Sequence, residues 1–145
     1  MSRMFTSYQT STNSFFCPPP FVNEPQKGAK VLTNIKGEVL GVQVDYNLPL
    51  QLYFHLENVC EVELNELLSG TALFEILTTT HKAIISQEYQ IASILDQGSN
   101  DLYIFLGTEE MKALKKETYN MRVTLKTAEH EYVVFAEKDG YLVIR

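Results

Sequence analysis

The sequence predicts an all-β protein built as an antiparallel β-sandwich. From Gly28 onward, short apolar stretches alternate with turn-forming residues, and strands recur about every 8 to 12 positions, which is typical of sandwiches. The clearest strand covers residues 119–126, where apolar and polar side chains alternate without interruption. Only residues 108–116 have the pattern of a helix, so one short helix is expected.

The strand at residues 119–126 defines the architecture best. One face carries the apolar residues Tyr119, Met121, Val123 and Leu125, and the other carries Asn120, Arg122, Thr124 and Lys126. A half-buried antiparallel strand needs this alternation. A tyrosine at the start of such a strand resembles the corner where a sandwich chain crosses between sheets with its phenol bonded to nearby backbone. Tyr119 is therefore expected to have a structural role.

Turn-forming residues separate the other strands. Lys36–Gly37 lies between the first two strands, and residues 78–81 join two neighbours as a hairpin. Residues 57–70 are acidic and are expected to form a loop, and Asp139–Gly140 is expected to form a hairpin turn. Strands are expected at 31–32, 39–44, 48–56, 72–76, 83–87, 91–95, 102–106, 119–126, 131–136 and 141–144.

The expected helix has suitable residues at both ends. Thr108 fits the N-cap, Glu109 and Glu110 complement the positive end of the helix dipole, and Lys115 and Lys116 complement the negative end. The helix has only about two turns, so it is expected to serve only as a connector between strands.

The charge of the chain argues against nucleic-acid binding. The net charge is −6, from 12 basic and 18 acidic residues. Residues 1–30 carry Arg3, Lys27 and Lys30 against Glu24, so the rest of the chain is more acidic still. Binding to a phosphate backbone relies on clustered lysine and arginine, which an acidic body does not favour.

Residues 1–27 are predicted to form an extended arm in front of a domain spanning 28–145. Four of the five prolines lie in the arm, three of them consecutive, and such a run imposes polyproline II. The arm is richer in aromatic residues than a solvated linker, which favours docking on a neighbouring protein. Folding back onto its own domain is the alternative. The expected docking residues are Phe5, Tyr8, Phe15, Phe16, Pro18, Pro19, Pro20 and Phe21.

No targeting segment or disulfide framework is recognisable. Polar residues interrupt the N-terminus where a signal peptide would be apolar, and no stretch is long enough to span a membrane. Cys17 and Cys60 form no spacing pattern, so two reduced thiols are expected. We expect no membrane partner.

The titratable residues do not form a recognisable catalytic or metal motif. His55 is expected to face outward on a strand, and His81 and His130 fall in turns, each without a second ligand at metal spacing. Glu61 and Glu63 would share one face if extended, but a solvated loop is favoured over a bridging cation. No cofactor and no enzymatic activity are expected; a hydrolase using a cysteine and a distant histidine is the weakest alternative.

Three aromatic residues offer a possible contact surface. Tyr53, Tyr103 and Phe105 fall on the faces opposite the inward residues of their strands. Such rings stack on sugars in carbohydrate-binding sandwiches, which is the alternative function. Coverage by the arm or by a neighbouring subunit is favoured, because strands that are apolar on both faces pack on both faces.

The order of features in the domain resembles the immunoglobulin-like N-terminal domain of phage baseplate upper proteins and related tailed-phage structural modules. The residues that carry the resemblance are 42–52, 72–76, 108–119, 123–125 and 140–144. The resemblance implies an immunoglobulin-like sandwich and a non-enzymatic virion structural protein assembled in the host cytoplasm. Its implied partners are capsid, tail or fibre proteins and further copies of itself.

This chain departs from that family at both ends. The family domain normally opens the chain and continues into fibre-forming regions, whereas here an aromatic arm comes first and the chain stops at Arg145, at the end of a predicted strand. The expectation is a free-standing fibre anchor, adaptor or decoration module.

Overall fold

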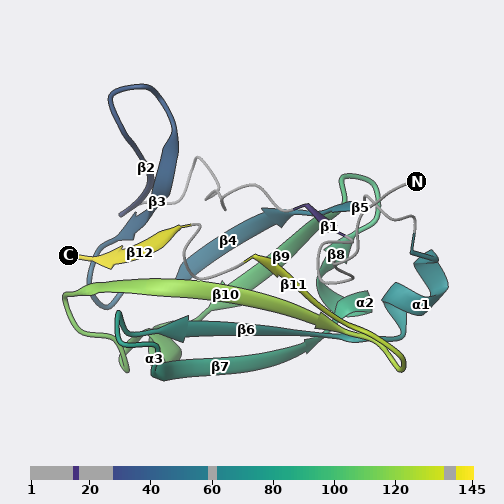
Figure 1. Cartoon of the computed structure of the whole chain (residues 1–145). Helices are drawn as coiled ribbons and strands as arrows, with labels where there is room; N and C mark the ends of the chain where they lie inside the picture. The colour runs from purple at the N-terminus through teal and green to yellow at the C-terminus, as the bar shows by residue number, and fades with distance from the viewer. Residues whose placement is uncertain (1–14, 17–27, 59–61, 136–139) are drawn as a thin grey trace.

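The computed structural model describes residues 15–16, 28–58, 62–135 and 140–145 and shows a mostly β protein (Figure 1). The strands are β1 (Phe15–Phe16), β2 (Ala29–Thr33), β3 (Val39–Val44), β4 (Leu50–His55), β5 (Glu57–Asn58), β6 (Thr71–Leu77), β7 (Ala83–Gln90), β8 (Leu95–Asp96), β9 (Asp101–Leu106), β10 (Thr118–Lys126), β11 (Glu131–Phe135) and β12 (Tyr141–Ile144). The helices are α1 (Leu64–Leu68), α2 (Ile91–Ile94) and α3 (Thr108–Met111).

Two sheets make up the body. The larger has the order β2–β3–β12–β10–β6–β7, with β11 also paired to β10, and the smaller has the order β4–β9–β8. Inward side chains of both sheets join in one core, as expected of a β-sandwich. Phe54 from the smaller sheet and Phe74 from the larger are both fully buried, with ring centroids 6.0 Å apart. The prediction of an all-β protein with packed antiparallel sheets is confirmed.

β10 is the central strand of the larger sheet and has the predicted alternation. Its apolar residues are buried and its polar residues are partly or fully exposed. One side pairs with β6 along most of its length, and the other pairs first with β12 and then with β11. The alternation therefore identified a strand with partners on both sides.

The prediction of a single helix is wrong, because the described residues contain three. Residues 91–95 were expected to be extended, but Ile91–Ile94 forms α2. Ile91 and Leu95 are both buried, and a spacing of four residues fits one helical turn as well as a short strand. α1 interrupts the expected acidic loop. No helix in the described part of the chain is long and apolar enough to cross a membrane.

The predicted helix at residues 108–116 is shorter than expected. α3 ends at Met111, and its N-cap is Gly107 rather than Thr108. The Gly107 backbone N–H donates to Glu110 Oε1 at 2.7 Å, so the acidic side chain satisfies backbone at the helix start. Lys115 and Lys116 follow the helix instead of ending it.

The C-terminal strands pair differently from the sequence prediction. A hairpin turn at Asp139–Gly140 would pair β11 with β12, but both pair with the same side of β10, and β12 also pairs with β3 in parallel. Asp139 itself lies outside the described residues. The parallel pair joins residues 100 positions apart in the chain, such as Gly41 and Tyr141, which local turn signals do not reveal.

The Tyr119 phenol is bonded to nearby backbone, as the sequence predicts. Tyr119 is the second residue of β10, which follows the crossing of the chain from β9 in the smaller sheet to the larger sheet. The Lys115 backbone N–H donates to the Tyr119 phenol oxygen at 2.8 Å, and the phenol donates to Glu117 Oε2 at 3.1 Å. The side chain is buried, so these bonds fix the crossover to the core.

Replacing Tyr119 with phenylalanine is expected to lower the free energy of unfolding at pH 7 by about 1 kcal/mol, the value of one lost hydrogen bond. Burial, and to a lesser extent the neighbouring Glu117, raises the pKa of the Tyr119 phenol above 10.0. A raised pKa in the folded state means that this stabilisation is complete below pH 10 and is lost as pH rises through the folded-state pKa. Urea unfolding at pH 7 and above pH 10 measures this effect. Between the two pH values the variant should lose less free energy of unfolding than the unaltered protein. Equal free energies of unfolding at pH 7 would contradict the structural role of the Tyr119 hydroxyl.

Candidate functional site

Only a short part of the predicted docking arm lies within the described residues. Phe15–Phe16 forms β1, which pairs antiparallel with β5 of the same chain, Phe15 opposite Asn58 and Phe16 opposite Glu57. This short stretch therefore lies on its own domain, as the fold-back alternative expected. The other arm residues, Phe5, Tyr8, Pro18, Pro19, Pro20 and Phe21, lie outside the described residues, as do Cys17, Cys60 and Glu61.

The predicted aromatic contact residues share the outer face of the smaller sheet. Tyr53 and Tyr103 are directly opposite each other in the β4–β9 pair, with ring centroids 5.2 Å apart and planes tilted by 41°. Both are half-buried, and burial, followed by the neighbouring Tyr53, raises the pKa of Tyr103. Phe105 is 46% exposed and is the most accessible ring of the three. Binding of a sugar on this face stays a prediction.

A polar group follows the aromatic pair along the same two strands. His55 lies opposite Asp101, and its Nδ1 is 2.9 Å from Asp101 Oδ1. The other ring nitrogen, Nε2, is 3.7 Å from Glu57 Oε1. His55 is partly exposed, as predicted, but it connects β4 to β9 and to β5, beside the strand that receives β1.

A second group of titratable side chains was not predicted from the sequence. Glu66 in α1 meets Glu129 and His130 in the β10–β11 turn, with one possible ligand atom from each within 4.8 Å of the others. The buried Thr127 hydroxyl donates to Glu66 Oε2 at 3.1 Å, and His130 Nδ1 lies 3.4 Å from the same oxygen. These contacts join the turn to the helix. Exposed acidic groups of this kind are common without a bound ion, so the group is explained by its structural contacts.

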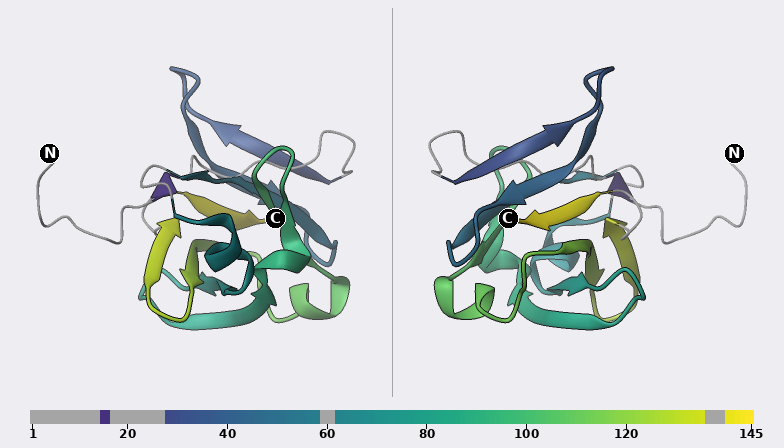
Figure 2. Two further views of the ribbon diagram at one scale, coloured as in Figure 1. Left: turned by 90° about the vertical axis from the view of Figure 1, so that its right-hand side faces the viewer. Right: turned by 90° about the vertical axis from the view of Figure 1, so that its left-hand side faces the viewer.

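The β2–β3 hairpin is a prominent exposed feature that the sequence did not single out. It rises away from the body in two perpendicular views (Figures 1 and 2). The Asn34 side-chain oxygen accepts hydrogen bonds from the Lys36 and Glu38 backbone N–H groups, at 2.9 and 3.0 Å, and so shapes the turn. Ile35, at the tip, is completely exposed, and Leu40 is 42% exposed.

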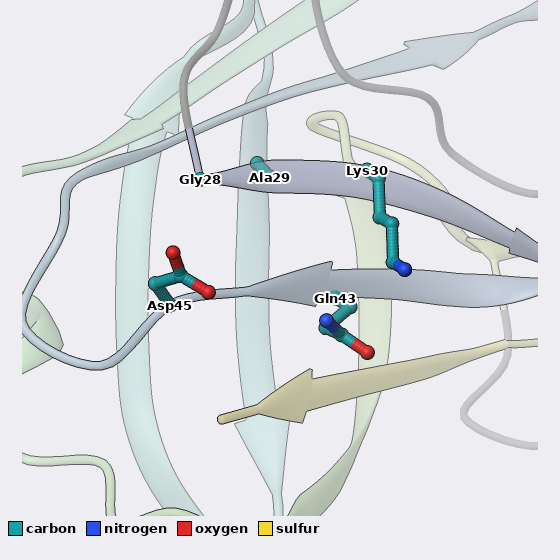
Figure 3. A pocket seen from close by; sticks show the side chains of 5 residues that line it. All are labelled: Gly28, Ala29, Lys30, Gln43 and Asp45. Atoms are coloured by element: carbon teal, nitrogen blue, oxygen red, sulfur yellow. The ribbon is translucent and has the colours of Figure 1, made fainter.

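A shallow depression lies at the base of this hairpin. Gly28, Ala29, Lys30, Gln43 and Asp45 line it, and the side chains of Lys30, Gln43 and Asp45 surround it (Figure 3). Its volume is about 260 Å³, below the range of roughly 300–1,000 Å³ typical of small-molecule pockets. The Asp45 backbone N–H donates to the Gly28 carbonyl at 2.8 Å and fixes the two strand ends.

The described residues thus define a β-sandwich body with an exposed apolar hairpin and an aromatic outer face. The sequence predicted the aromatic outer face. It did not predict the exposed apolar hairpin, because Ile35 and Leu40 follow no clear apolar pattern. Among known proteins, no family model matches the chain and no curated protein shows significant similarity.

Proposed function

We propose that this chain is a non-enzymatic structural protein of a tailed-phage particle, acting as a fibre anchor, adaptor or decoration module. Its body is an immunoglobulin-like sandwich, and its N-terminal arm docks on neighbouring virion proteins of the capsid, tail or fibre. It assembles in the host cytoplasm and requires no nucleic acid, membrane or cofactor. The resemblance of residues 42–144 to phage structural modules supports this proposal.

The proline-rich and aromatic composition of residues 1–27 supports an arm-based role most directly, whereas the pairing of β1 with β5 places Phe15–Phe16 on its own domain. Phe15–Phe16 engages the body through backbone pairing as a short added strand. Addition of a strand is a common way for an extended segment to bind a protein, because main-chain hydrogen bonds supply affinity without a preformed pocket. The arm therefore contains a backbone that adds to a sheet.

The roles of the titratable side chains in the body also support a structural function. His55 connects β4 with β9, and His130 lies against the helix residue Glu66. Tyr119 fixes the crossover between the sheets. Each of these side chains therefore makes a contact between elements of the fold.

Deleting residues 2–27 is expected to leave a folded protein that particles no longer incorporate. Every residue of the described core lies at or after Val42, so residues 28–145 should still unfold cooperatively. The measurement is mass spectrometry of purified particles from a phage that carries the altered gene, compared with the unaltered phage.

A triple variant separates the docking side chains from β1. Phe5→Ser, Tyr8→Ser and Phe21→Ser together leave Phe15 and Phe16 in place, so β1 is retained. Incorporation should fall as it does in the deletion. Normal incorporation of both altered proteins would contradict the arm proposal, and absence of the unaltered chain from particles would contradict the virion assignment.

A further inference from the structure

β4 is the end strand of the smaller sheet, whose order is β4–β9–β8 (Figure 1). Its neighbour β9 lies next to β7, because the Tyr89 hydroxyl donates to the Phe105 carbonyl at 3.3 Å. β1 lies instead close to β11, nearer the other side of the larger sheet, and pairs with β5, which follows β4. β1 is therefore on the flank of β4 that faces away from β9, which we call the far flank.

The two ends of residues 17–27 are fixed at opposite ends of β4. At one end, Phe16 lies opposite Glu57 in β5, just after β4. At the other end, Gly28 lies against the residues that precede β4, so closely that a Cβ atom on Gly28 would collide with the Leu48 side chain. The connection must therefore travel the length of β4, in the direction opposite to β4 itself.

The length of the connection leaves it little freedom. In the antiparallel register set by Phe16 and Glu57, each step along the connection meets one step back along β4, so Pro25 would arrive opposite Leu48. Gly28 arrives there instead, so the connection is only three residues longer than a strand that follows β4 throughout. Three residues add about 10 Å of extended chain, which is too little for a path around the body.

The composition of the connection suits the flank of an end strand. Proline lacks a backbone donor and is found mainly on edge strands, and the three prolines at residues 18–20 impose an extended backbone. The register above brings Pro20 beside Tyr53, whose ring packs against Tyr103. Polyproline segments dock on aromatic surfaces because their conformation is already extended and has little entropy to lose.

We infer that residues 17–22 of this chain run along the far flank of β4, antiparallel to it, with Pro20 beside Tyr53 and Val22 beside Gln51. The prolines then keep further strands from adding to this flank, as they do on other edge strands. The arm is divided in two by this contact. Residues 1–14 are left as the part that reaches a neighbouring protein, and they leave the body beside β5.

This inference goes beyond the proposed function, because it concerns contacts within one chain that exist before any assembly. Its experiments use the isolated protein. Their failure would leave docking by the arm standing, and normal incorporation of the chain without its arm would leave the contact with β4 untouched.

A pair of engineered cysteines tests the path and its register. In a full-length background with Cys17→Ser and Cys60→Ser, Val22→Cys and Gln51→Cys place two thiols opposite each other. Cα atoms opposite each other in an antiparallel pair are about 4.5–5.5 Å apart, within the range of disulfides. Mild oxidation should convert most of the protein to a monomer with an internal disulfide, seen on a non-reducing gel and by peptide mapping.

Val22→Cys combined with Ile84→Cys is the control, because Ile84 is exposed on β7, at the far end of the other sheet. This pair should give little internal disulfide. Absence of the internal disulfide between positions 22 and 51, or equal yields from the two pairs, would overturn the inference.

Two deletions test the length of the connection without relying on a cysteine. Removing residues 24–26 takes up the three surplus residues and should leave β1 paired with β5. Removing residues 22–27 makes the connection three residues too short, so β1 should detach. Hydrogen exchange of the β1 and β5 amides should be unchanged in the first variant and roughly tenfold faster in the second. Unchanged exchange in the longer deletion, or equal acceleration in both, would refute the path along β4.

Discussion

Replacing Phe74 with alanine is expected to lower the free energy of unfolding by about 3–5 kcal/mol, the range measured for large-to-small substitution of buried aromatics. Phe74 lies in β6 near the middle of the larger sheet and is completely buried. Its ring meets Phe54 of the smaller sheet at a centroid distance of 6.0 Å and an interplanar angle of 56°. The substitution removes one of the contacts that join the sheets and leaves a cavity that strands paired on both sides cannot collapse to fill.

Phe105→Ala is the matched control for this prediction. It removes the same atoms from a strand of the smaller sheet, but the ring is about half exposed and lies outside the core. Its expected cost is about 1 kcal/mol, because full burial of a phenylalanine contributes roughly 1.5–3 kcal/mol. Urea unfolding of both variants measures the difference. Similar losses in the two would mean that Phe74 does not join the sheets as the structure indicates.

The parts of the fold that could be predicted from the sequence are those with local signals. The alternation at Tyr119–Lys126 predicted β10, and Gly37 and the turn at residues 78–81 predicted the hairpins at the two ends of the larger sheet. Ile91–Ile94 was misassigned because one turn of helix and a short strand bury similarly spaced residues. The pairing of β12 with β3 could not be predicted, since parallel pairing between distant segments leaves no turn residue in the chain.

The exposed surfaces were predicted in part for a similar reason. Period-two alternation placed Tyr53, Tyr103 and Phe105 on an outer face, where the structure also has them. The β2–β3 hairpin was recognised as a hairpin, but its exposure depends on where the smaller sheet ends. That boundary is a property of the packed sheets, so Ile35 and the edge of β2 emerged only from the structure.

Gly41 is the residue on which the parallel β3–β12 pair depends. In the register of the two strands Gly41 lies opposite Tyr141, and their backbones approach closely. A Cβ atom on Gly41 would lie 2.1 Å from the Tyr141 carbonyl oxygen and 2.6 Å from its nitrogen. These are backbone atoms of a paired strand, so they cannot rotate away as a flexible side chain would. A side chain at this position must separate the two strands.

Gly41→Ala is therefore expected to cost about 3 kcal/mol, the upper part of the range for overpacking a closely packed site. The damage should be local: amide hydrogen exchange should accelerate in β3 and β12, which hold the β2–β3 hairpin to β10, more than in β6 and β7. Gly37→Ala is the matched control, because Gly37 has a φ of 83° and nothing within 4 Å of an added Cβ. That change should cost only the backbone term of about 1–2 kcal/mol. Equal losses of unfolding free energy in the two variants, or unchanged exchange in β12, would show that close approach to Tyr141 is not what requires glycine at position 41.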